Sequence, residues 1–144
     1  MANVADVTAI VQERCGAFLA QANVLTGDEG APSVNQAIAW ALRALSYPVA
    51  NVRMATDTEV QAVSTALLDA LLDLTELRTL ESIQTNLTAV TVKAGPVQED
   101  YNDLASRLGK IINEKRENAA VRHGQWLAVP LTGNAPKRAG LRAV

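Results

Sequence analysis

The chain has 144 residues, 49% of them hydrophobic and 3% aromatic, with a net charge of −2 and a single cysteine. That length fits one domain that can bury a core without help from disulfides or structural metals, and the lone Cys15 excludes an internal disulfide framework. The sequence has no run of about 18 apolar residues, so we expect no segment that crosses a membrane. The low aromatic content favours a core of small and aliphatic side chains between closely packed helices.

Two helices are predicted first, from apolar residues that recur at three- and four-residue steps. The stripe at residues 6–22 consists of Val7, Ile10, Val11, Cys15, Phe18, Leu19 and Ala22. After the turn cluster "TGDEGAP", a second helix is expected to begin at Ser33, which forms a capping-box pattern with Gln36. Pro48 should end it, because the residue before proline is kept out of the α region. The apolar stripe of this helix is Val34, Ile38, Ala41, Leu42 and Leu45.

The middle of the chain predicts a short helix and then a long one. Residues 55–63 should form the short helix, with Thr56 and Glu59 as a second capping box. The long helix should open at Ser64 and run to about Asn86, with the apolar stripe Leu67, Leu71, Leu74, Leu77, Leu80, Ile83 and Leu87. Residues 87–96, "LTAVTVKAGP", alternate valine with threonine and lysine, so we expect a short extended segment or loop there.

A last helix is predicted from Pro96 or Val97 to His123, with Gly124 as its C-terminal cap. Its expected buried face is Tyr101, Leu104, Leu108, Ile111 and Ile112. We therefore predict an all-α fold: a small bundle of about four helices at residues 1–124, followed by an extended C-terminal arm at residues 125–144.

Carboxylates on the long helix raise the question of a metal or catalytic site. Asp69, Asp73 and Glu76 step by four and three along a face different from that of the leucines. Di-iron bundles join such acids to Glu-x-x-His pairs that point into the core, but this chain has one histidine, His123. The pattern favours a solvated or partner-facing side of a structural helix, and we expect no metal and no cofactor.

The remaining candidates for chemistry also favour structural interpretations. Cys15 lies on the apolar face of the first helix, whereas reactive cysteines need an electropositive and partly open setting; we expect a buried structural thiol. His123 is interpreted as a helix cap or an exposed residue rather than a general base. The basic run "KIINEKRENAAVRH" is interrupted by Glu114 and Glu117, as in an ordinary solvated helix face. We expect no catalytic residues and a protein that is not an enzyme.

The C-terminal arm combines apolar and cationic residues. The last twenty residues hold Lys137, Arg138 and Arg142 and no acid, which leaves a charge of −5 on residues 1–124. Their apolar residues are Trp126, Leu127, Val129 and Leu131. Two interpretations stay open. The arm folds back over one side of the bundle, or it docks onto another chain, where tryptophan and arginine often carry the binding energy.

The order of these segments resembles that of the head-to-tail adaptor (connector) proteins of tailed bacteriophages and related particles. The resemblance covers residues 33–123 and rests on "LLDLTELRTLESI", then "VTVKAGP", then "EDYNDLASRLGKIINEKREN". The residues that carry it are Leu74, Glu76, Leu77, Gly95, Pro96, Leu104 and Leu108. It includes no catalytic signature, and the long arm and the "TGDEGAP" turn have no assigned counterpart.

The resemblance implies an all-α subunit of a dodecameric ring in the neck of the virion, made in the host cytoplasm. Such a ring binds the portal protein on one side and a stopper or tail-terminator protein on the other, with no membrane partner. DNA passes through its centre without sequence-specific binding, which an acidic body suits. C-terminal segments in the family often dock on the portal, which here assigns that role to Trp126, Leu127, Val129, Leu131, Lys137, Arg138 and Arg142.

A ring also needs contacts between neighbouring subunits. We hypothesise that the acidic stripe Asp69, Asp73 and Glu76 of one copy meets the cationic helix end Lys115, Arg116 and Arg122 of the next.

Other functional classes remain as alternatives. A stopper protein would be rich in β-strands, and the sequence has almost no strand signal. A small helical DNA-binding regulator would need a basic recognition helix, which the acidic body argues against. An enzyme would require Cys15 or His123 to carry the chemistry.

Overall fold

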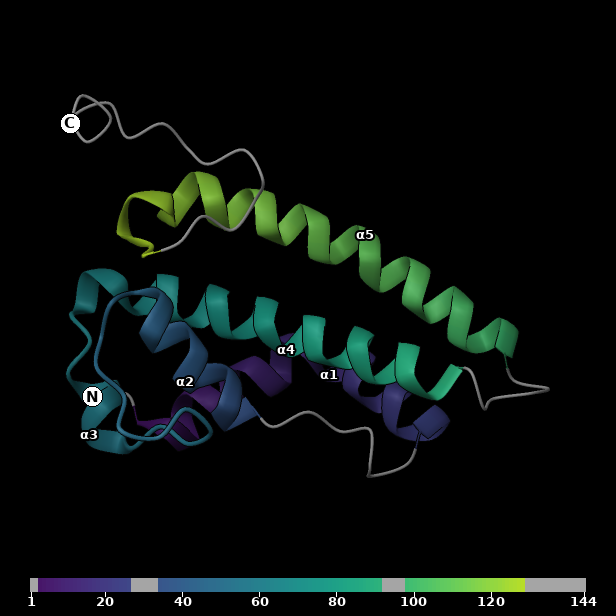
Figure 1. The fold of residues 1–144 in the computed structure, drawn as a ribbon, viewed down its shortest axis with the longest axis horizontal. Helices are drawn as coiled ribbons and strands as arrows, with labels where there is room; N and C mark the ends of the chain where they lie inside the picture. The colour runs from purple at the N-terminus through teal and green to yellow at the C-terminus, as the bar shows by residue number, and fades with distance from the viewer. Residues whose placement is uncertain (1–2, 27–33, 92–97, 129–144) are drawn as a thin grey trace.

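The computed structural model describes residues 3–26, 34–91 and 98–128, and these ranges are helical apart from a loop at residues 45–56 and short turns (Figure 1). The helices are α1 (Val4–Thr26), α2 (Val34–Ala44), α3 (Asp57–Gln61), α4 (Leu68–Thr91) and α5 (Gln98–His123). Two 3-10 turns flank α4 and α5, η2 (Thr65–Leu67) and η4 (Gly124–Trp126). Within the described ranges there is no strand, only an isolated β-bridge between Asn51 and Met54. The predicted all-α fold is confirmed.

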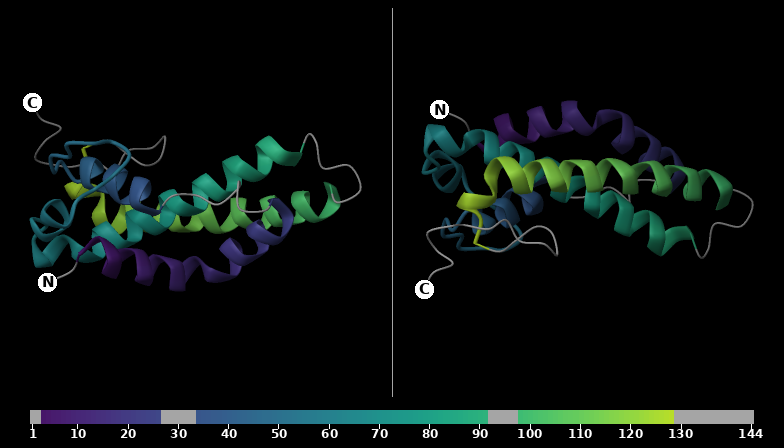
Figure 2. Two further views of the ribbon diagram at one scale, coloured as in Figure 1. Left: turned by 90° about the horizontal axis from the view of Figure 1, so that it is seen from below. Right: turned by 90° about the horizontal axis from the view of Figure 1, so that it is seen from above.

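Helix α4 is the centre of the fold. Helices α1, α2 and α5 all contact it, and Figures 1 and 2 show α5 running alongside α4 with α1 and α2 against its other sides. The predicted leucine stripe is confirmed as core: Leu71, Leu74, Leu77, Leu80 and Ile83 are fully buried. Burial of each such side chain contributes about 1.5–3 kcal/mol. A helix with three helical neighbours buries more than one stripe, so polar residues of α4 also enter the interior.

Two of those interior polar residues are threonines whose hydroxyls bond within α4. Thr75 Oγ1 donates to the carbonyl oxygen of Leu71 (2.7 Å), and Thr79 Oγ1 donates to that of Thr75 (2.8 Å). Both residues are fully buried. Because each hydroxyl uses a carbonyl one turn earlier, neither needs a partner from another helix.

Two helix ends differ from the sequence predictions. Helix α4 continues to Thr91, so the extended segment expected from residue 87 is wrong for residues 87–91, and residues 92–96 lie outside the described ranges. Once a helix has formed, each added residue requires only its own backbone to be fixed. The lower helix propensity of a β-branched residue costs less than about 1 kcal/mol, which is too little to end the helix. At the other end, η2 precedes α4 and the Ser64 side chain makes no capping hydrogen bond.

Helix α2 ends at Ala44, earlier than Pro48 requires. Ser46 takes a left-handed conformation with φ of 68°. Its N–H donates to the carbonyl oxygen of Arg43 (3.0 Å), and the Tyr47 N–H donates to that of Leu42 (2.9 Å). This pair of bonds is a Schellman motif, which satisfies the last carbonyls of the helix. The predicted stripe of α2 is buried, whereas Ser33 of the expected capping box lies outside the described residues.

The outer helices agree with their predicted faces. Val7, Val11 and Cys15 of α1 are buried, as are Leu104, Leu108 and Ile112 of α5. Ile10 is exposed, and Phe18 and Ile111 are partly buried against the core. Leu19, Ala22, Leu87 and Tyr101 have side chains outside the described set. None of the described helices is long and apolar enough to span a membrane.

The predicted capping box of α3 is confirmed, and it also fastens the preceding loop. Thr56 Oγ1 accepts from the Glu59 N–H (3.2 Å), and Glu59 Oε1 accepts from the Thr56 N–H (2.9 Å). Glu59 Oε2 accepts from the Ala50 N–H (2.8 Å). The backbone hydrogen bonds from Ala50 and Thr56 hold the pKa of the Glu59 carboxyl below its ordinary value.

Replacing Glu59 with glutamine should therefore destabilise the protein at neutral pH, because an amide keeps only one acceptor oxygen for two backbone donors. Because the pKa of the Glu59 carboxyl is lowered in the folded state, this group adds stability above pH 4.5. That stability is lost as pH falls through the folded-state pKa. The urea midpoint of Glu59→Gln should lie below that of the unmodified chain at neutral pH, and this difference should shrink as pH falls below 4.5. A difference that stays the same as pH falls would contradict this account.

Candidate functional site

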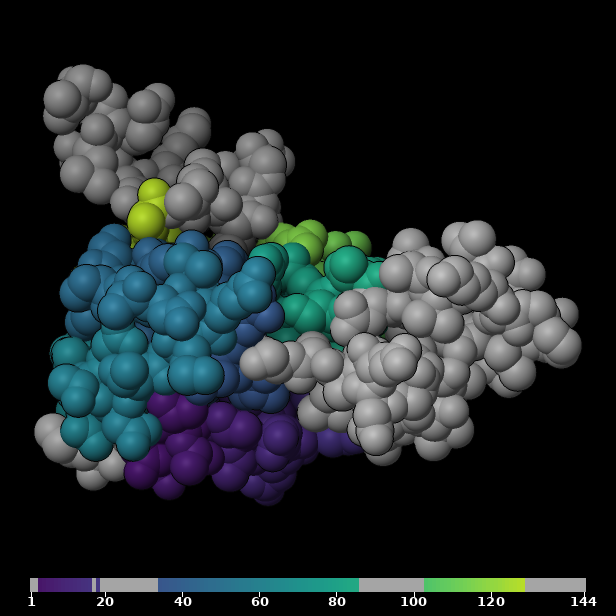
Figure 3. Space-filling model, turned by 60° about the horizontal axis from the view of Figure 1, so that its bottom comes forward, coloured from purple at the N-terminus to yellow at the C-terminus, as the bar shows by residue number. Residues whose placement is uncertain are grey.

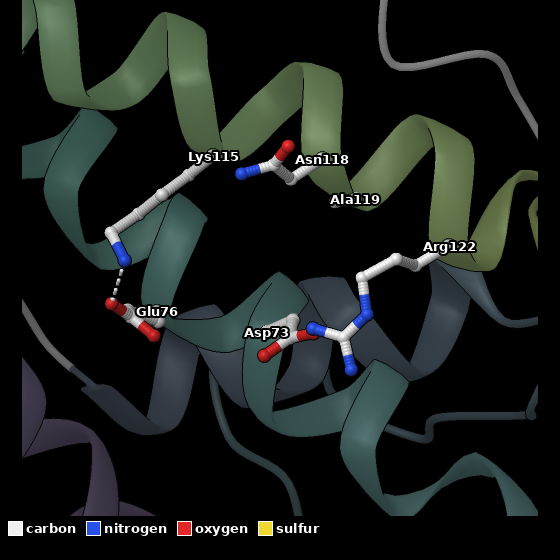
Figure 4. Close-up of a pocket in the computed structure, with 6 residues that line it drawn as sticks. All are labelled: Asp73, Glu76, Lys115, Asn118, Ala119 and Arg122. Carbon is white, nitrogen blue, oxygen red and sulfur yellow. Dashed lines mark hydrogen bonds and ion pairs between the residues drawn. The ribbon is translucent and has the colours of Figure 1, made fainter.

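Four of the six charged residues expected at a subunit interface, Asp73, Glu76, Lys115 and Arg122, instead meet inside one chain. Asp73 and Glu76 of α4 face Arg14 of α1 on one side and Lys115, Arg122 and His123 of α5 on the other. Figure 4 shows the part formed by α4 and α5, with the ion pair between Lys115 and Glu76 marked. These six residues are called the charged cluster below.

Glu76 is the most buried member of the charged cluster, with a side chain 8% exposed. Lys115 Nζ lies 2.6 Å from Glu76 Oε1, and Arg14 Nη1 lies 3.3 Å from Glu76 Oε2. The prediction of a solvated or partner-facing helix side is wrong for this residue. Burial of a carboxylate is costly unless cations and hydrogen bonds compensate it, and here each oxygen has a cation.

Asp73 joins all three helices. Arg14 Nη1 lies 3.2 Å from Oδ1, and Arg122 Nη1 lies 3.0 Å from Oδ2. His123 Nε2 lies 2.8 Å from the same Oδ2. A carboxylate only accepts hydrogen bonds, so Nε2 is the donor. His123 is buried, and its interpretation as an exposed residue is wrong.

The other predicted interface residues lie apart from the charged cluster. Arg116 pairs with Glu81 of α4, with 3.0 Å between Nη2 and Oε2. Asp69 is exposed and forms no ion pair with another described residue. Within one chain, Asp73 and Glu76 pair with Lys115 and Arg122 of the cationic helix end, and Arg116 pairs with Glu81 outside the acidic stripe.

A hollow of about 100 Å³ adjoins the charged cluster, lined by Asp73, Glu76, Lys115, Asn118, Ala119 and Arg122 (Figure 4). That volume suits a few water molecules. Among the described residues, no group of three or more histidine, cysteine or acidic side chains could hold a metal ion. The acids of the charged cluster are thus paired with cations from α1 and α5, and these ion pairs hold both helices against α4.

Cys15 is buried, which confirms the prediction of a structural thiol. Burial, and then the charge of Glu76, raise the pKa of the Cys15 thiol to about 12. The thiolate is the reactive form of cysteine, so the native thiol is both covered and protonated near neutral pH.

Cys15 should therefore react with an aromatic disulfide reagent only when the fold opens. Labelling followed by absorbance should be slow in native buffer and should reach one equivalent rapidly in concentrated urea, since unfolding removes the burial that raises the pKa. A Cys15→Ser variant serves as the blank. Fast labelling in native buffer would mean that α1 separates readily from α4.

The structure describes only the first part of the predicted arm, up to Ala128. Leu127 is 2% exposed and belongs to the hydrophobic core, and the Ala128 N–H donates to the carbonyl oxygen of Ala44 at 2.8 Å. Trp126 is 48% exposed. Chain packing thus continues past the predicted boundary at residue 124, and Leu127 covers its own bundle. Val129, Leu131, Lys137, Arg138 and Arg142 lie outside the described residues.

Sequence reasoning missed Arg14 and the role of His123 in the charged cluster. Arg14 and Asp73 are 59 positions apart, and Asp73 and His123 are 50 apart. No spacing rule for a single helix links such residues. The only signal in the sequence was the match in charge between the α4 acids and the end of α5.

Comparisons of the chain with protein-family models, with curated proteins and with solved structures give no match.

Proposed function

We propose that this chain is a head-to-tail adaptor, a structural subunit of a ring that joins a portal protein to a stopper or tail-terminator protein. The observation that supports this proposal best is the folding of the segments that resemble the adaptor family. Two of them form α4 and α5, which pack directly on each other. The leucines that carry the resemblance, Leu74, Leu77, Leu104 and Leu108, are all buried core residues.

The proposal assigns portal docking to the C-terminal arm. Trp126 offers a half-exposed indole just before Leu127 and Ala128, the last described residues, and tryptophan is enriched among residues that dominate binding energy. Leu127 serves the fold, so docking falls to Trp126 together with Val129, Leu131, Lys137, Arg138 and Arg142. The charge of −5 on residues 1–124 favours passage of DNA through the ring without tight binding.

The first test is quantitative mass spectrometry of density-purified particles from the source, relative to the major capsid protein. A fixed content of about a dozen copies per particle, as ring symmetry requires, supports the adaptor function. Absence from particles overturns it. A small helical DNA-binding regulator then becomes the leading function, to be tested by salt-dependent retardation of duplex DNA.

The second test measures binding to the portal protein by a chain truncated after Ala128. This truncation keeps Leu127 and the Ala128–Ala44 hydrogen bond, so the bundle should remain folded. Truncation after Gly124 would instead remove a core residue and confuse loss of folding with loss of docking. Unchanged portal affinity of the chain ending at Ala128 would show that residues 129–144 do not dock.

A further inference from the structure

A hollow of about 210 Å³ lies between α2 and α4, on a side of the molecule different from the charged cluster. Its lining residues are Gln36, Ala37, Trp40, Arg43, Val52, Arg78 and Ser82. The Arg78 guanidinium lies 5.2 Å from the centroid of the Trp40 ring, whose π-face attracts it. The lining thus combines two arginines with apolar surface and contains no acid. It is called the cationic hollow below.

The charge of the cationic hollow is not balanced within the described chain. Five described cations of α1 and α5 have acidic partners, whereas Lys110 of α5 forms no ion pair with another described residue. The five are Arg14, Arg107, Lys115, Arg116 and Arg122. Arg43 and Arg78 are exposed and form no ion pair with another described residue. Arginine presents a planar fork of donors that matches a carboxylate, so the hollow suits an acidic group flanked by apolar surface.

Helix α5 carries a surface with the opposite character. Glu114, Glu117 and Val121 are spaced by three and four residues and share one face. That face points away from α4, because Leu108, Ile112 and Ala119 occupy the opposite side of α5 and are buried. Both acids are exposed and form no ion pair with another described residue, and Val121 is 85% exposed. These three residues are called the acidic ridge below.

We propose that the acidic ridge of one copy of this chain seats on the cationic hollow of the next copy. Glu114 and Glu117 pair with Arg43 and Arg78, while Val121 packs against the apolar part of the hollow near Val52. The two surfaces match in sign and in their apolar component, and such complementarity fixes the orientation of partners. The inference rests on the proposed ring and supplies the subunit contact that the charged cluster, already paired internally, does not.

The placement of the two surfaces makes this contact head-to-tail. Figure 3 shows the face on which α2 and the loop after it lie, and the part of α5 visible in that view lies above them. When two copies bind through two different surfaces, the pair still has one free acidic ridge at one end and one free cationic hollow at the other. Further copies can therefore add, and the assembly closes into a ring when the rotation between neighbouring subunits allows.

A charge-swap experiment on the full chain tests the proposal. One variant carries Glu114→Lys with Glu117→Lys, and the other carries Arg43→Glu with Arg78→Glu. Association is followed by analytical ultracentrifugation up to about 1 mM, the weak end of specific association. The unmodified chain should form oligomers that dissociate with rising salt. Each variant alone should associate about tenfold more weakly or not at all. An equal mixture should recover association, because the reversed charges attract again.

The control variant carries Asp6→Lys with Glu13→Lys, the same change in net charge at exposed acids of α1, away from both proposed surfaces. It should associate like the unmodified chain. A second probe, Val121→Asp, should weaken association without touching either arginine. Circular dichroism verifies that each variant is folded, as expected for exposed positions.

The proposal is overturned by a monomeric unmodified chain at about 1 mM, by normal association of either double variant, or by a mixture that fails to recover. These outcomes leave the adaptor function standing if particles still contain about a dozen copies. Conversely, recovery in the mixture with no chain in purified particles would retain this contact and discard the adaptor function.

Discussion

Replacing both Arg14 and Lys115 with methionine should lower the free energy of unfolding by about 3–5 kcal/mol at neutral pH. The two substitutions remove both cations from Glu76, whose side chain is 8% exposed. Methionine keeps much of the apolar stem that Arg14 and Lys115 contribute, so lost packing is a minor part of the effect. Urea unfolding monitored by circular dichroism measures the change.

Two further variants separate charge burial from other causes. Adding Glu76→Met to the double variant should recover most of the loss, because no buried carboxylate is then left without a cation. Arg107→Met, which breaks an exposed pair with Asp103, should cost less than about 1 kcal/mol. A loss of less than about 1 kcal/mol in the Arg14 and Lys115 double variant would refute the importance of the charged cluster for stability.

Leu127→Ala should destabilise the protein by about 2–5 kcal/mol, the range for a buried leucine. Leu127 is 2% exposed and packs in the core next to the Ala128–Ala44 hydrogen bond. The neighbouring residue provides the matched comparison. Trp126 is 48% exposed, so Trp126→Ala should change the unfolding free energy by less than about 1.5 kcal/mol. Thermal and urea unfolding of both variants measure this difference.

Binding to the portal protein should rank the same two variants in the opposite order. If the chain docks on a portal as proposed, Trp126→Ala should weaken docking under conditions where both variants are folded, because the proposal gives the half-exposed indole to the docking surface. Leu127→Ala should bind nearly as the unmodified chain does.

The stability comparison has its own contradicting outcome. If Leu127→Ala proved as stable as Trp126→Ala, the chain after α5 would not be fixed to the bundle as the structure has it.

Periodicity in the sequence was sufficient to predict the core. The stripes of α1, α2 and α4 recur at helical spacing, and a buried apolar face is what that spacing encodes. The capping box at Thr56 and Glu59 was also predictable, because its two reciprocal bonds lie within four consecutive residues. Local patterns predicted local structure in both cases.

Helix ends and the partners of charged residues were less predictable. The end of α2 depends on Ser46 taking a left-handed conformation, which serine rarely does and no motif announced. The helical spacing of the acids of α4 was predicted correctly, but their burial was not. Opposite charges on α4 and α5 give the same sequence pattern whether the two helices meet within one chain or between neighbouring chains. Only the packing of α5 along α4 decides between them.

The hydrogen bond from Ala128 to Ala44 fixes the position of the last described residue. A fully extended backbone advances at most about 3.3–3.6 Å per residue, so residues 129–144 can reach no farther than about 58 Å from that point. Any protein held by Lys137, Arg138 or Arg142 is consequently tethered within a sphere centred near the end of α2. Lengthening this tether by insertion after Ala128 would dilute the local concentration of the held partner without altering a single contact.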